Sequence, residues 1–337
     1  AASRAALKFG TGSSGSRLTT GGTFIASELE KRLADFKHSE SALVFNTGYM
    51  TNLGILYGLL QTGDVVFSDE LNHASIIDGC RISRCKVVVY KHNDMADLQR
   101  LLETEIVTGQ RFIVTDGVFS MDGDIADLPS LAVLKKQFNA CLIVDDAHGV
   151  GVIGNDGSGT ASHYGLTDVI DLQVGTLSKA LAAEGGYVAG KKILIDYLIN
   201  RSRPFIFSTA LAPATLAAAN AALLLLQTQA SKYLDSLRAN SRLMRRLLLE
   251  GGLNVVEGIT PIIPVVIGEA GLTMQFADRL KSKGILVSGI RPPTVPRGES
   301  RLRITVTAAH CEEQLRQAAQ IITALWQELK HGEKKEG

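Results

Sequence analysis

Residues 141–148 have the sequence CLIVDDAH, and this segment carries the clearest information about the architecture. Its apolar first half predicts a strand covered on both faces, and its second half places two carboxylates and an imidazole directly after that strand. Amphipathic stretches at 24–37 and 95–103 alternate with further apolar runs, which predicts an α/β fold with a mostly parallel sheet between helices. The other runs that predict buried strands lie at 42–45, 65–67, 86–90, 112–115 and 169–174.

The pattern changes near residue 212, where two long helical segments follow each other at 213–229 and 232–250. We therefore expect a large domain over residues 1–230 and a smaller α+β domain over residues 231–337. The first residues resemble the middle of a helix and no Met precedes them, so we expect an N-terminal segment to be missing. The small domain is expected to contain strands near 263–267, 285–288 and 302–306 and a final helix at 312–329.

The composition argues against nucleic acids and membranes as binding partners. The chain has 35 Lys and Arg against 34 Asp and Glu, a net charge of +1, which gives no electrostatic footprint for nucleic acid or a membrane surface. Its longest apolar stretches, such as 211–226, are too short to span a bilayer. The four cysteines form no CxxC pair and no zinc-like cluster with His, so we expect no metal site and a reducing, cytoplasmic location.

A glycine-rich loop offers one alternative function. Residues 10–15, GTGSSG, match the GxGxxG pattern of dinucleotide-binding loops, which would make the chain an NAD-dependent dehydrogenase. That pattern requires a strand before the loop and a helix directly after it, whereas the residues before Gly10 look helical and a Gly/Ser/Thr loop continues to Gly22. We expect a surface loop instead, or a loop that reaches an active site.

A lysine and a carboxylate follow two of the predicted strands. Lys179 lies in GTLSKA at 175–180, and Asp145 ends the strand at 141–145. Ligands bind at the carboxyl ends of strands in open α/β sheets, and desolvation of a lysine there frees its amine to attack a carbonyl. Pyridoxal phosphate (PLP) requires a Schiff-base lysine and a carboxylate on its pyridine nitrogen. Lys179 and Asp145 are therefore predicted to hold PLP.

Three further segments complete the predicted site. Gly48 and Tyr49 open a helix after the first strand and suit a phosphate group. His73 lies at another helix start, where it either belongs to the cap or stacks on the pyridine ring; Ser120 lies in a turn that could border the ring oxygen. Each segment alone has an ordinary structural explanation, but their order, strand after strand, indicates a PLP site.

These segments resemble the α-oxoamine synthase family of fold-type I PLP enzymes, and the resemblance covers nearly the whole chain. It implies a PLP-binding large domain with a seven-stranded type of sheet and a smaller C-terminal domain. The motifs that carry it are LNHASIID (71–78), TDGVFSMDGD (115–124), VDDAHGVGVIG (144–154), GTLSKA (175–180), GGYVAG (185–190) and, most specifically, IRPPTVPRGESRLRITVTAAH (290–310).

The resemblance also implies roles for individual residues. Lys179 would form the Schiff base, Asp145 would pair with the pyridine nitrogen and His148 would hydrogen-bond the ring hydroxyl. His73 would stack on the ring. The phosphate would be held by Gly48, Tyr49 and Thr176, and the partner subunit's cofactor would be approached by Ser208, Thr209 and the loop 12–22.

Arg303 is expected to bind the amino-acid carboxylate, since a planar guanidinium pairs with a carboxylate through two parallel hydrogen bonds. Arg301, two residues earlier on the same predicted strand, and Arg291 remain competing candidates. Thr294 is expected near the substrate. After Lys179 the usual glycine-containing run is replaced by Leu-Ala-Ala-Glu at 181–184, which is a departure from the family pattern.

Within the family, segment 290–310 is most similar to the biotin-pathway acyltransferase. It implies a homodimer that condenses L-alanine with a pimeloyl thioester, carried by coenzyme A or an acyl carrier protein, with decarboxylation. The alternatives are a glycine-using relative, such as 2-amino-3-ketobutyrate CoA ligase or 5-aminolevulinate synthase, or a serine-using palmitoyltransferase. A non-catalytic module on the same fold is the remaining alternative.

Overall fold

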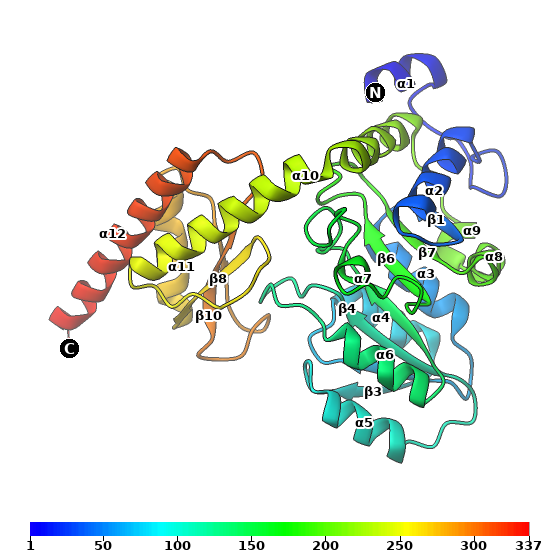
Figure 1. The fold of residues 1–337 in the computed structure, drawn as a ribbon, viewed down its shortest axis with the longest axis horizontal. Helices are drawn as coiled ribbons and strands as arrows, with labels where there is room; N and C mark the ends of the chain where they lie inside the picture. The colour runs from blue at the N-terminus through cyan, green and yellow to red at the C-terminus, as the bar shows by residue number, and fades with distance from the viewer. Residues whose placement is uncertain (337) are drawn as a thin grey trace. The chain divides into compact units, whose positions relative to one another are not determined.

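The computed structural model describes residues 1–336, with side chains as far as Lys330. The chain divides into two compact units (Figure 1). The first unit comprises Ala1–Phe119 and Ile125–Ala230. The second unit comprises the short segment Ser120–Asp124 and the residues from Ser231 onward. A cofactor-binding role for residues 1–230 stays a prediction at this point.

A seven-stranded sheet forms the centre of the first unit, in the order β1-β7-β6-β5-β4-β2-β3. All neighbouring pairs from β6 to β3 are parallel, whereas β7 is antiparallel to both β6 and β1. The predicted mostly parallel α/β sheet is therefore confirmed. The strands are β1 Ser41–Phe45, β2 Val65–Asp69, β3 Lys86–Tyr90, β4 Arg111–Asp116, β5 Ala140–Asp145, β6 Leu172–Thr176 and β7 Gly186–Gly190.

Three strands differ from the expectation. Strand β7 was not predicted, because its glycine ends gave the segment the appearance of a loop. Strand β6 begins at Leu172 and ends at Thr176, later than the predicted 169–174. Strand β3 is not buried on both faces, because it lies at the sheet edge and leaves Val87 and Val89 exposed.

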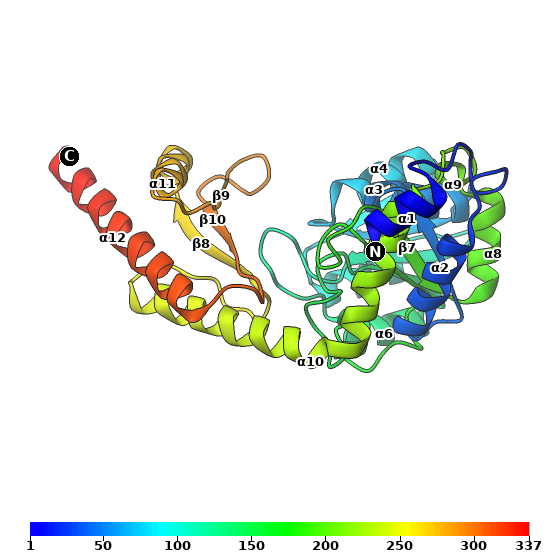
Figure 2. The same cartoon turned by 90° about the horizontal axis from the view of Figure 1, so that it is seen from above.

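Helices cover both faces of this sheet, as Figure 2 shows from above. Successive side chains of β1 point to opposite faces of the sheet, so each face has its own hydrophobic core. Leu43 and Phe45 pack on one face, whereas Ala42 and Val44 pack on the other. Helices α3, α4, α8 and α9 cover the first side, and α2, α5, α6 and the first part of α10 cover the second. The helices are α1 Ala2–Phe9, α2 Phe24–Phe36, α3 Gly48–Leu59, α4 Ala74–Ser83, α5 Met95–Thr104, α6 Leu128–Gln137, α7 Thr160–His163, α8 Lys192–Arg201, α9 Arg203–Ile206 and α10 Pro213–Glu250.

Side-chain caps begin several of these helices. The Thr47 hydroxyl accepts the Met50 N–H at the start of α3, and Asp94 and Asp127 cap α5 and α6 in the same way. Helix α10 combines the two helical segments expected from the sequence, with a non-helical residue at Gln229 between them.

The second unit is a smaller α+β structure. Its antiparallel sheet has the order β8-β10-β9 and packs on helices, with Phe276 and Trp326 stacked in its core. Strand β9 lies a few residues later than the predicted 285–288. The elements are β8 Ile262–Gly268, α11 Ala270–Ser282, β9 Ser288–Ile290, β10 Ser300–Thr305 and α12 Glu312–Glu336, beside the last part of α10.

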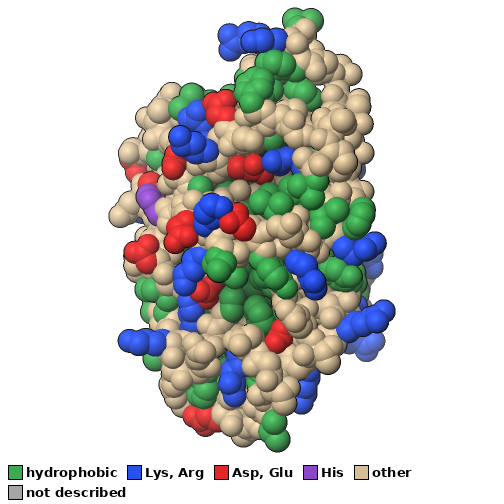
Figure 3. All heavy atoms as spheres, turned by 90° about the vertical axis from the view of Figure 1, so that its right-hand side faces the viewer, with side chains coloured by type: hydrophobic (Ala, Val, Ile, Leu, Met, Phe, Trp, Pro, Cys, Tyr) green, Lys and Arg blue, Asp and Glu red, His purple; other side chains and the backbone are tan. Residues whose placement is uncertain are grey.

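Surface charges of both signs are interspersed, with hydrophobic side chains between them, on the face shown in Figure 3. Within residues 1–336, no helix combines the length and the apolar character that crossing a bilayer requires. The part of the chain that the structure describes also contains no cluster of His, Cys, Asp and Glu suited to a metal ion.

Candidate active site

The carboxyl ends of the parallel strands bring polar side chains together at one edge of the first unit's sheet. Asp116 ends β4 and Asp145 ends β5, and the two residues are direct partners in the register of these strands. Thr176 ends β6, and Lys179 follows three residues later. Backbone hydrogen bonds continue beyond the strands, with the Gly117 N–H donating to the Asp145 carbonyl at 2.7 Å.

Asp145 is a buried carboxylate whose oxygens have assigned donors. Its side chain accepts the Asn52 amide N–H at 2.6 Å on Oδ2 and the Ala147 backbone N–H at 3.0 Å on Oδ1. Only 7 % of Asp145 is exposed. A carboxylate held from two sides in this way has a defined direction, which a partner for a pyridine nitrogen requires.

Asp116 was not among the predicted site residues. Burial raises the pKa of its carboxyl well above the usual range, and the negative charge of Asp145 raises it further. The charge of Lys179 and a hydrogen bond from the His73 backbone act in the opposite direction on this pKa. Asp116, Asp145, Lys179 and His73 are therefore close enough to interact electrostatically.

Lys179 departs from the expectation in one respect. We predicted a desolvated amine, but Lys179 is exposed, as are its neighbours Ser178 and Ala180. The reason is local, because β6 ends at Thr176 and the chain turns outward at the surface before β7. Its charge acts on the buried carboxyl of Asp116, the register partner of Asp145, and its predicted place opposite Asp145 stays a prediction.

His73 is the N-cap residue of α4, as one of its two interpretations proposed. Its Nδ1 accepts the Ser75 N–H at 3.2 Å and lies 2.7 Å from the Ser75 hydroxyl. His73 is exposed, so its role as a cap does not bury it. His148 is half-buried in the turn that follows β5.

The start of α3 adjoins the end of β6. A Cβ placed on Gly48 would lie 3.4 Å from the Cβ of Thr176, and one placed on Gly186 would lie 2.6 Å from the Gly48 nitrogen. These glycines therefore allow the helix N-terminus to approach the two strands closely. Thr176 donates its hydroxyl to the Gly185 carbonyl at 3.0 Å.

Tyr49 has a different environment. Its side chain is exposed, and its hydroxyl donates to Asp78 at 2.5 Å, which raises the pKa of the phenol. Only its backbone N–H belongs to the helix start.

The loop 12–22 pairs with the segment around Thr209. Ser16 and Thr209 form an isolated antiparallel bridge, and the Ser13 hydroxyl donates to the Ala210 carbonyl at 2.6 Å. Ser208 is the half-buried neighbour of Thr209. Helix α1, rather than a strand, precedes this loop, so the dinucleotide-binding interpretation of residues 10–15 has no structural support.

Arg303, Arg301 and Ser120 all belong to the second unit. Arg301 is buried, and its guanidinium forms ion pairs with Asp122 and Glu299. Arg303 instead donates to the Ser120 carbonyl at 2.5 Å and to the Thr305 hydroxyl, and burial lowers its pKa.

The other second-unit candidates are exposed. Arg291 and Thr294 both lie on the surface, and the Thr294 N–H donates to the Arg291 carbonyl at 3.1 Å. Among the residues with described side chains, Arg303 has no carboxylate partner, whereas Arg301 has two.

Several polar residues around the site were not predicted from the sequence. Asn52 and Ser75 lie between Asp145 and His73, and Lys37 forms a fully buried ion pair with Asp146 at 3.0 Å. The sequence feature that could have identified Asn52 is its amide side chain, which interrupts the apolar helix GYMTNLGILYGL one turn after Gly48. Lys37 carries no comparable signal, because it lies directly after a helix in a position typical of surface residues.

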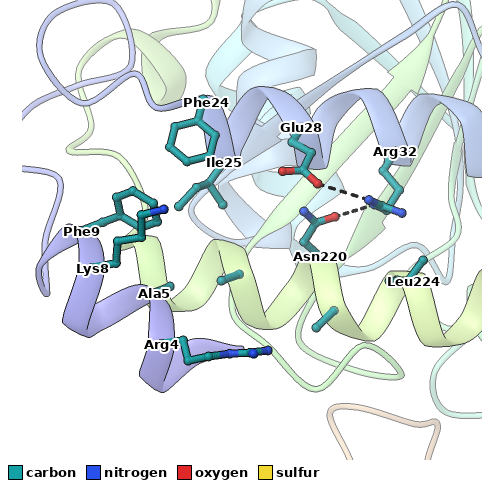
Figure 4. Close-up of a pocket in the computed structure, with 12 residues that line it drawn as sticks. Arg4, Ala5, Lys8, Phe9, Phe24, Ile25, Glu28, Arg32, Asn220 and Leu224 are labelled. Atoms are coloured by element: carbon teal, nitrogen blue, oxygen red, sulfur yellow. Dashed lines mark hydrogen bonds and ion pairs between the residues drawn. The ribbon is translucent and has the colours of Figure 1, made fainter.

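A surface pocket of about 400 Å³ lies elsewhere on the first unit, between α1, α2 and α10 (Figure 4). Phe9, Phe24 and Ile25 contribute apolar walls, and Arg32 is bonded to Glu28 and Asn220 along one side. None of the predicted site residues lines it, so it gives no support to any of the predicted roles.

The residues at the strand ends fit PLP. One sheet edge brings together the buried carboxylate of Asp145, the amine of Lys179, whose charge acts on the neighbouring Asp116, the exposed capping residue His73 and a glycine-lined helix N-terminus. These are the groups that the pyridine nitrogen, the aldehyde, the ring and the phosphate of this cofactor require.

Known proteins share both this sequence and this fold. The model of the family "Aminotransferase class I and II" matches residues 1–322. The 8-amino-7-oxononanoate synthase of Lysinibacillus sphaericus is 51 % identical over 91 % of this chain and 79 % of its own length. That of Geobacter sulfurreducens is 51 % identical over 98 % of this chain and 84 % of its own length.

Solved structures agree with the sequence relatives. A serine palmitoyltransferase structure with its PLP internal aldimine has a TM-score of 0.95 at 32 % identity, covering 98 % of this chain and 83 % of that one. The 8-amino-7-oxononanoate synthase of Francisella tularensis has a TM-score of 0.81 at 31 % identity, covering 98 % and 92 %. The chain belongs to the aminotransferase class I and II family and, within it, to the α-oxoamine synthases that its motifs resemble.

Proposed function

We propose that the chain is a PLP-dependent acyltransferase that condenses L-alanine with a pimeloyl thioester to give 8-amino-7-oxononanoate, with loss of carbon dioxide. The observation that carries this function is about 50 % identity to 8-amino-7-oxononanoate synthases over nearly the whole chain. PLP is the cofactor of this family, and the reaction belongs to biotin biosynthesis.

Bound PLP supplies an aldehyde that condenses with an amine and a protonated ring that accepts the electrons released at the substrate Cα. Lys179 would hold the cofactor covalently at rest and, once displaced by alanine, would take the proton from the alanine Cα. Asp145 would accept the N–H of the pyridine ring and keep it protonated. Ser120 and His148 would lie near the ring hydroxyl, and His73 would stack on the ring.

The phosphate and substrate contacts follow from the same arrangement. The N-terminus of α3, at Gly48 and Tyr49, would donate backbone N–H groups to the phosphate beside Thr176. Arg303 would bind the alanine carboxylate, since its guanidinium is not committed to an acidic partner in the described part of the chain. Thr294 would lie near the acyl substrate.

We also propose a homodimer in the cytoplasm, with Ser208, Thr209 and the loop 12–22 directed toward the partner subunit's cofactor. The pairing of this loop with Thr209 supports a common role for the two segments. All four cysteines are free, which agrees with a reducing compartment.

A serine-using synthase is the second candidate, because the TM-score is higher for serine palmitoyltransferase than for the Francisella tularensis synthase. Sequence identity is the better guide to the substrate. The TM-score measures a fold that these enzymes share, whereas substrate choice depends on individual side chains. Identity to 8-amino-7-oxononanoate synthases reaches 51 %, against 32 % for the serine palmitoyltransferase.

Product identification tests this proposal. The protein with PLP is offered alanine, glycine or serine together with pimeloyl-CoA, and the products are identified by mass spectrometry. We expect 8-amino-7-oxononanoate from alanine and at least tenfold less product from the other two amino acids. A dominant product from glycine or serine would contradict the substrate assignment.

Substitution of the lysine tests the chemistry itself. Lys179→Ala should abolish the covalent bond to PLP and product formation, whereas Lys31→Ala, an exposed lysine on α2, should preserve both. Normal turnover by Lys179→Ala would show that this amine does not perform the proton transfer.

A further inference from the structure

A continuous chain of hydrogen bonds connects the side chain of Asp145 to the ring of His73. The Asn52 amide nitrogen donates to Asp145 Oδ2 at 2.6 Å and to the Ser75 hydroxyl at 2.9 Å. The Ser75 hydroxyl in turn lies 2.7 Å from His73 Nδ1. Two residues that were not predicted as site residues therefore join Asp145 and His73, the two residues proposed to contact the ring.

The chemistry of each group sets the direction of this chain. As a carboxylate, Asp145 can only accept, so the Asn52 side chain must present its nitrogen, which can only donate. One N–H of that amide is used on Asp145 and the other on Ser75. The Ser75 oxygen is thus an acceptor from Asn52, and its own hydrogen remains for His73.

His73 Nδ1 must then accept. The Ser75 hydroxyl and the Ser75 backbone N–H, at 3.2 Å, both point their hydrogens at this nitrogen. An imidazole nitrogen that accepts carries no proton, so the ring is neutral with its proton on Nε2. The chain from Asp145 through Asn52 and Ser75 therefore adds a hydroxyl donor to His73 Nδ1 beside the Ser75 backbone N–H, and both donors favour the ring with its proton on Nε2.

Burial makes this chain specific. Asn52 is 3 % exposed and Ser75 is 1 % exposed, so water does not compete for their hydrogen bonds. A buried donor or acceptor that loses its partner incurs its full desolvation penalty, which disfavours any reversed arrangement. Both residues lie on packed helices: Asn52 is one turn after Gly48 on α3, and Ser75 is in the first turn of α4.

We propose that Asn52 and Ser75 are positioning residues that orient the Asp145 carboxylate and hold His73 in its Nε2-protonated tautomer. The inference rests on the proposed function only in assigning Asp145 and His73 to the cofactor ring. The hydrogen-bond chain itself belongs to the protein and can be measured without substrate.

The tautomer is the direct readout. Two-bond proton–nitrogen correlation spectra of the PLP-loaded protein labelled with ¹⁵N-histidine distinguish the two tautomers, and a His73→Gln variant assigns the signal among the seven histidines. We expect the Nε2-protonated pattern in the wild type and in Ser75→Thr, which retains the hydroxyl. Ser75→Ala removes the hydroxyl donor and keeps only the backbone N–H at Nδ1, so the preference should weaken and a detectable fraction of Nδ1-protonated or charged ring should appear.

Ser83→Ala is the matched control, because Ser83 lies on the same helix and donates its hydroxyl to the Cys80 carbonyl, away from Asp145. It should leave the His73 signal unchanged. A wild-type ring protonated on Nδ1, or an unchanged tautomer in Ser75→Ala, would overturn the proposal.

Asn52→Leu tests the Asp145 end of the chain. Loss of a hydrogen bond to a charged group should lower kcat about 10- to 100-fold and speed PLP release, with a smaller change in the KM for alanine. Gln173→Met is the control, since Gln173 is an equally buried amide that donates to the Lys37 carbonyl. It should reduce stability without altering the His73 tautomer or kcat.

The two proposals fail in different ways. A wild-type protein that makes no 8-amino-7-oxononanoate but shows the Nε2-protonated His73 would refute the function and leave the positioning role intact. A wild-type protein that is active, with variants at Asn52 and Ser75 that match their controls in tautomer, kcat and PLP release, would refute the positioning role alone.

Discussion

Replacing Lys37 by Met removes the cationic half of a fully buried ion pair. Lys37 Nζ lies 3.0 Å from Asp146 Oδ2, and the two side chains are 0 % and 1 % exposed. At an effective dielectric constant of about 20, charges at this distance attract by about 5 kcal/mol. Asp146 also accepts the backbone N–H and the hydroxyl of Thr160, which remain in the variant.

We expect Lys37→Met to lower the free energy of unfolding by about 3–5 kcal/mol, because it leaves a buried carboxyl without its counter-charge. In a unit of roughly 200 residues this corresponds to a fall in Tm of about 6–20 °C. Asp146 directly follows Asp145, so faster PLP release should accompany the loss. Thermal and chemical denaturation, followed through the unfolding transition of the first unit, measure the effect.

The pH dependence supplies an internal check. Burial raises the pKa of Asp146, and the charge of Lys37 partly offsets this, so removing Lys37 should raise it further. A carboxyl whose folded pKa exceeds its unfolded value binds more protons in the folded state, so stability falls as pH rises between the two values. The loss in Lys37→Met should therefore be larger at pH 8 than at pH 5.

Two further variants decide whether the reasoning holds. In the double variant Lys37→Met/Asp146→Asn no charge stays buried, so it should be more stable than the sum of the two single losses predicts, by about 2–3 kcal/mol. Lys192→Met removes an exposed ion pair with Asp196 and should cost less than about 1 kcal/mol. A loss below about 1 kcal/mol in Lys37→Met, or strict additivity in the cycle, would refute the account.

Three other variants test separate parts of the structure. Asp116→Asn should flatten the pH dependence of stability and stabilise the protein more at pH 8 than at pH 5, because burial raises the pKa of this carboxyl. The same difference in denaturation midpoint between variant and wild type at both pH values would contradict this. Gly186→Ala should cost about 1–3 kcal/mol and weaken PLP binding, because the new Cβ would lie 2.6 Å from the Gly48 nitrogen, and an unchanged Tm would argue against the close approach. Arg303→Leu should raise the KM for alanine about 10-fold or more with little change in Tm, whereas Arg301→Leu, which breaks a buried ion pair, should lower Tm. Steady-state kinetics and calorimetry measure the two effects, and the reverse pattern would assign binding of the alanine carboxylate to Arg301.

Local patterns along the chain were sufficient for the mostly parallel sheet and for several strand-end residues, although they missed strand β7 and the role of Asp116. Buried parallel strands are continuous apolar runs whatever their neighbours are, and their carboxyl ends meet at one edge. The sequence alone therefore places Asp145 and Thr176 at that edge. Threonine and aspartate caps mark helix starts in the same local way, as at Thr47.

Contacts between distant segments were decided by the tertiary structure alone. Asn52 meets a residue 93 positions away and Lys37 one 109 positions away, and nothing in the sequence near either residue identifies its partner. The exposure of β3 and Lys179 likewise depends on which element covers them, not on their own composition. Periodicity reports the face on which a side chain lies, whereas pairing, burial and hydrogen-bond direction arise only when separate elements pack together.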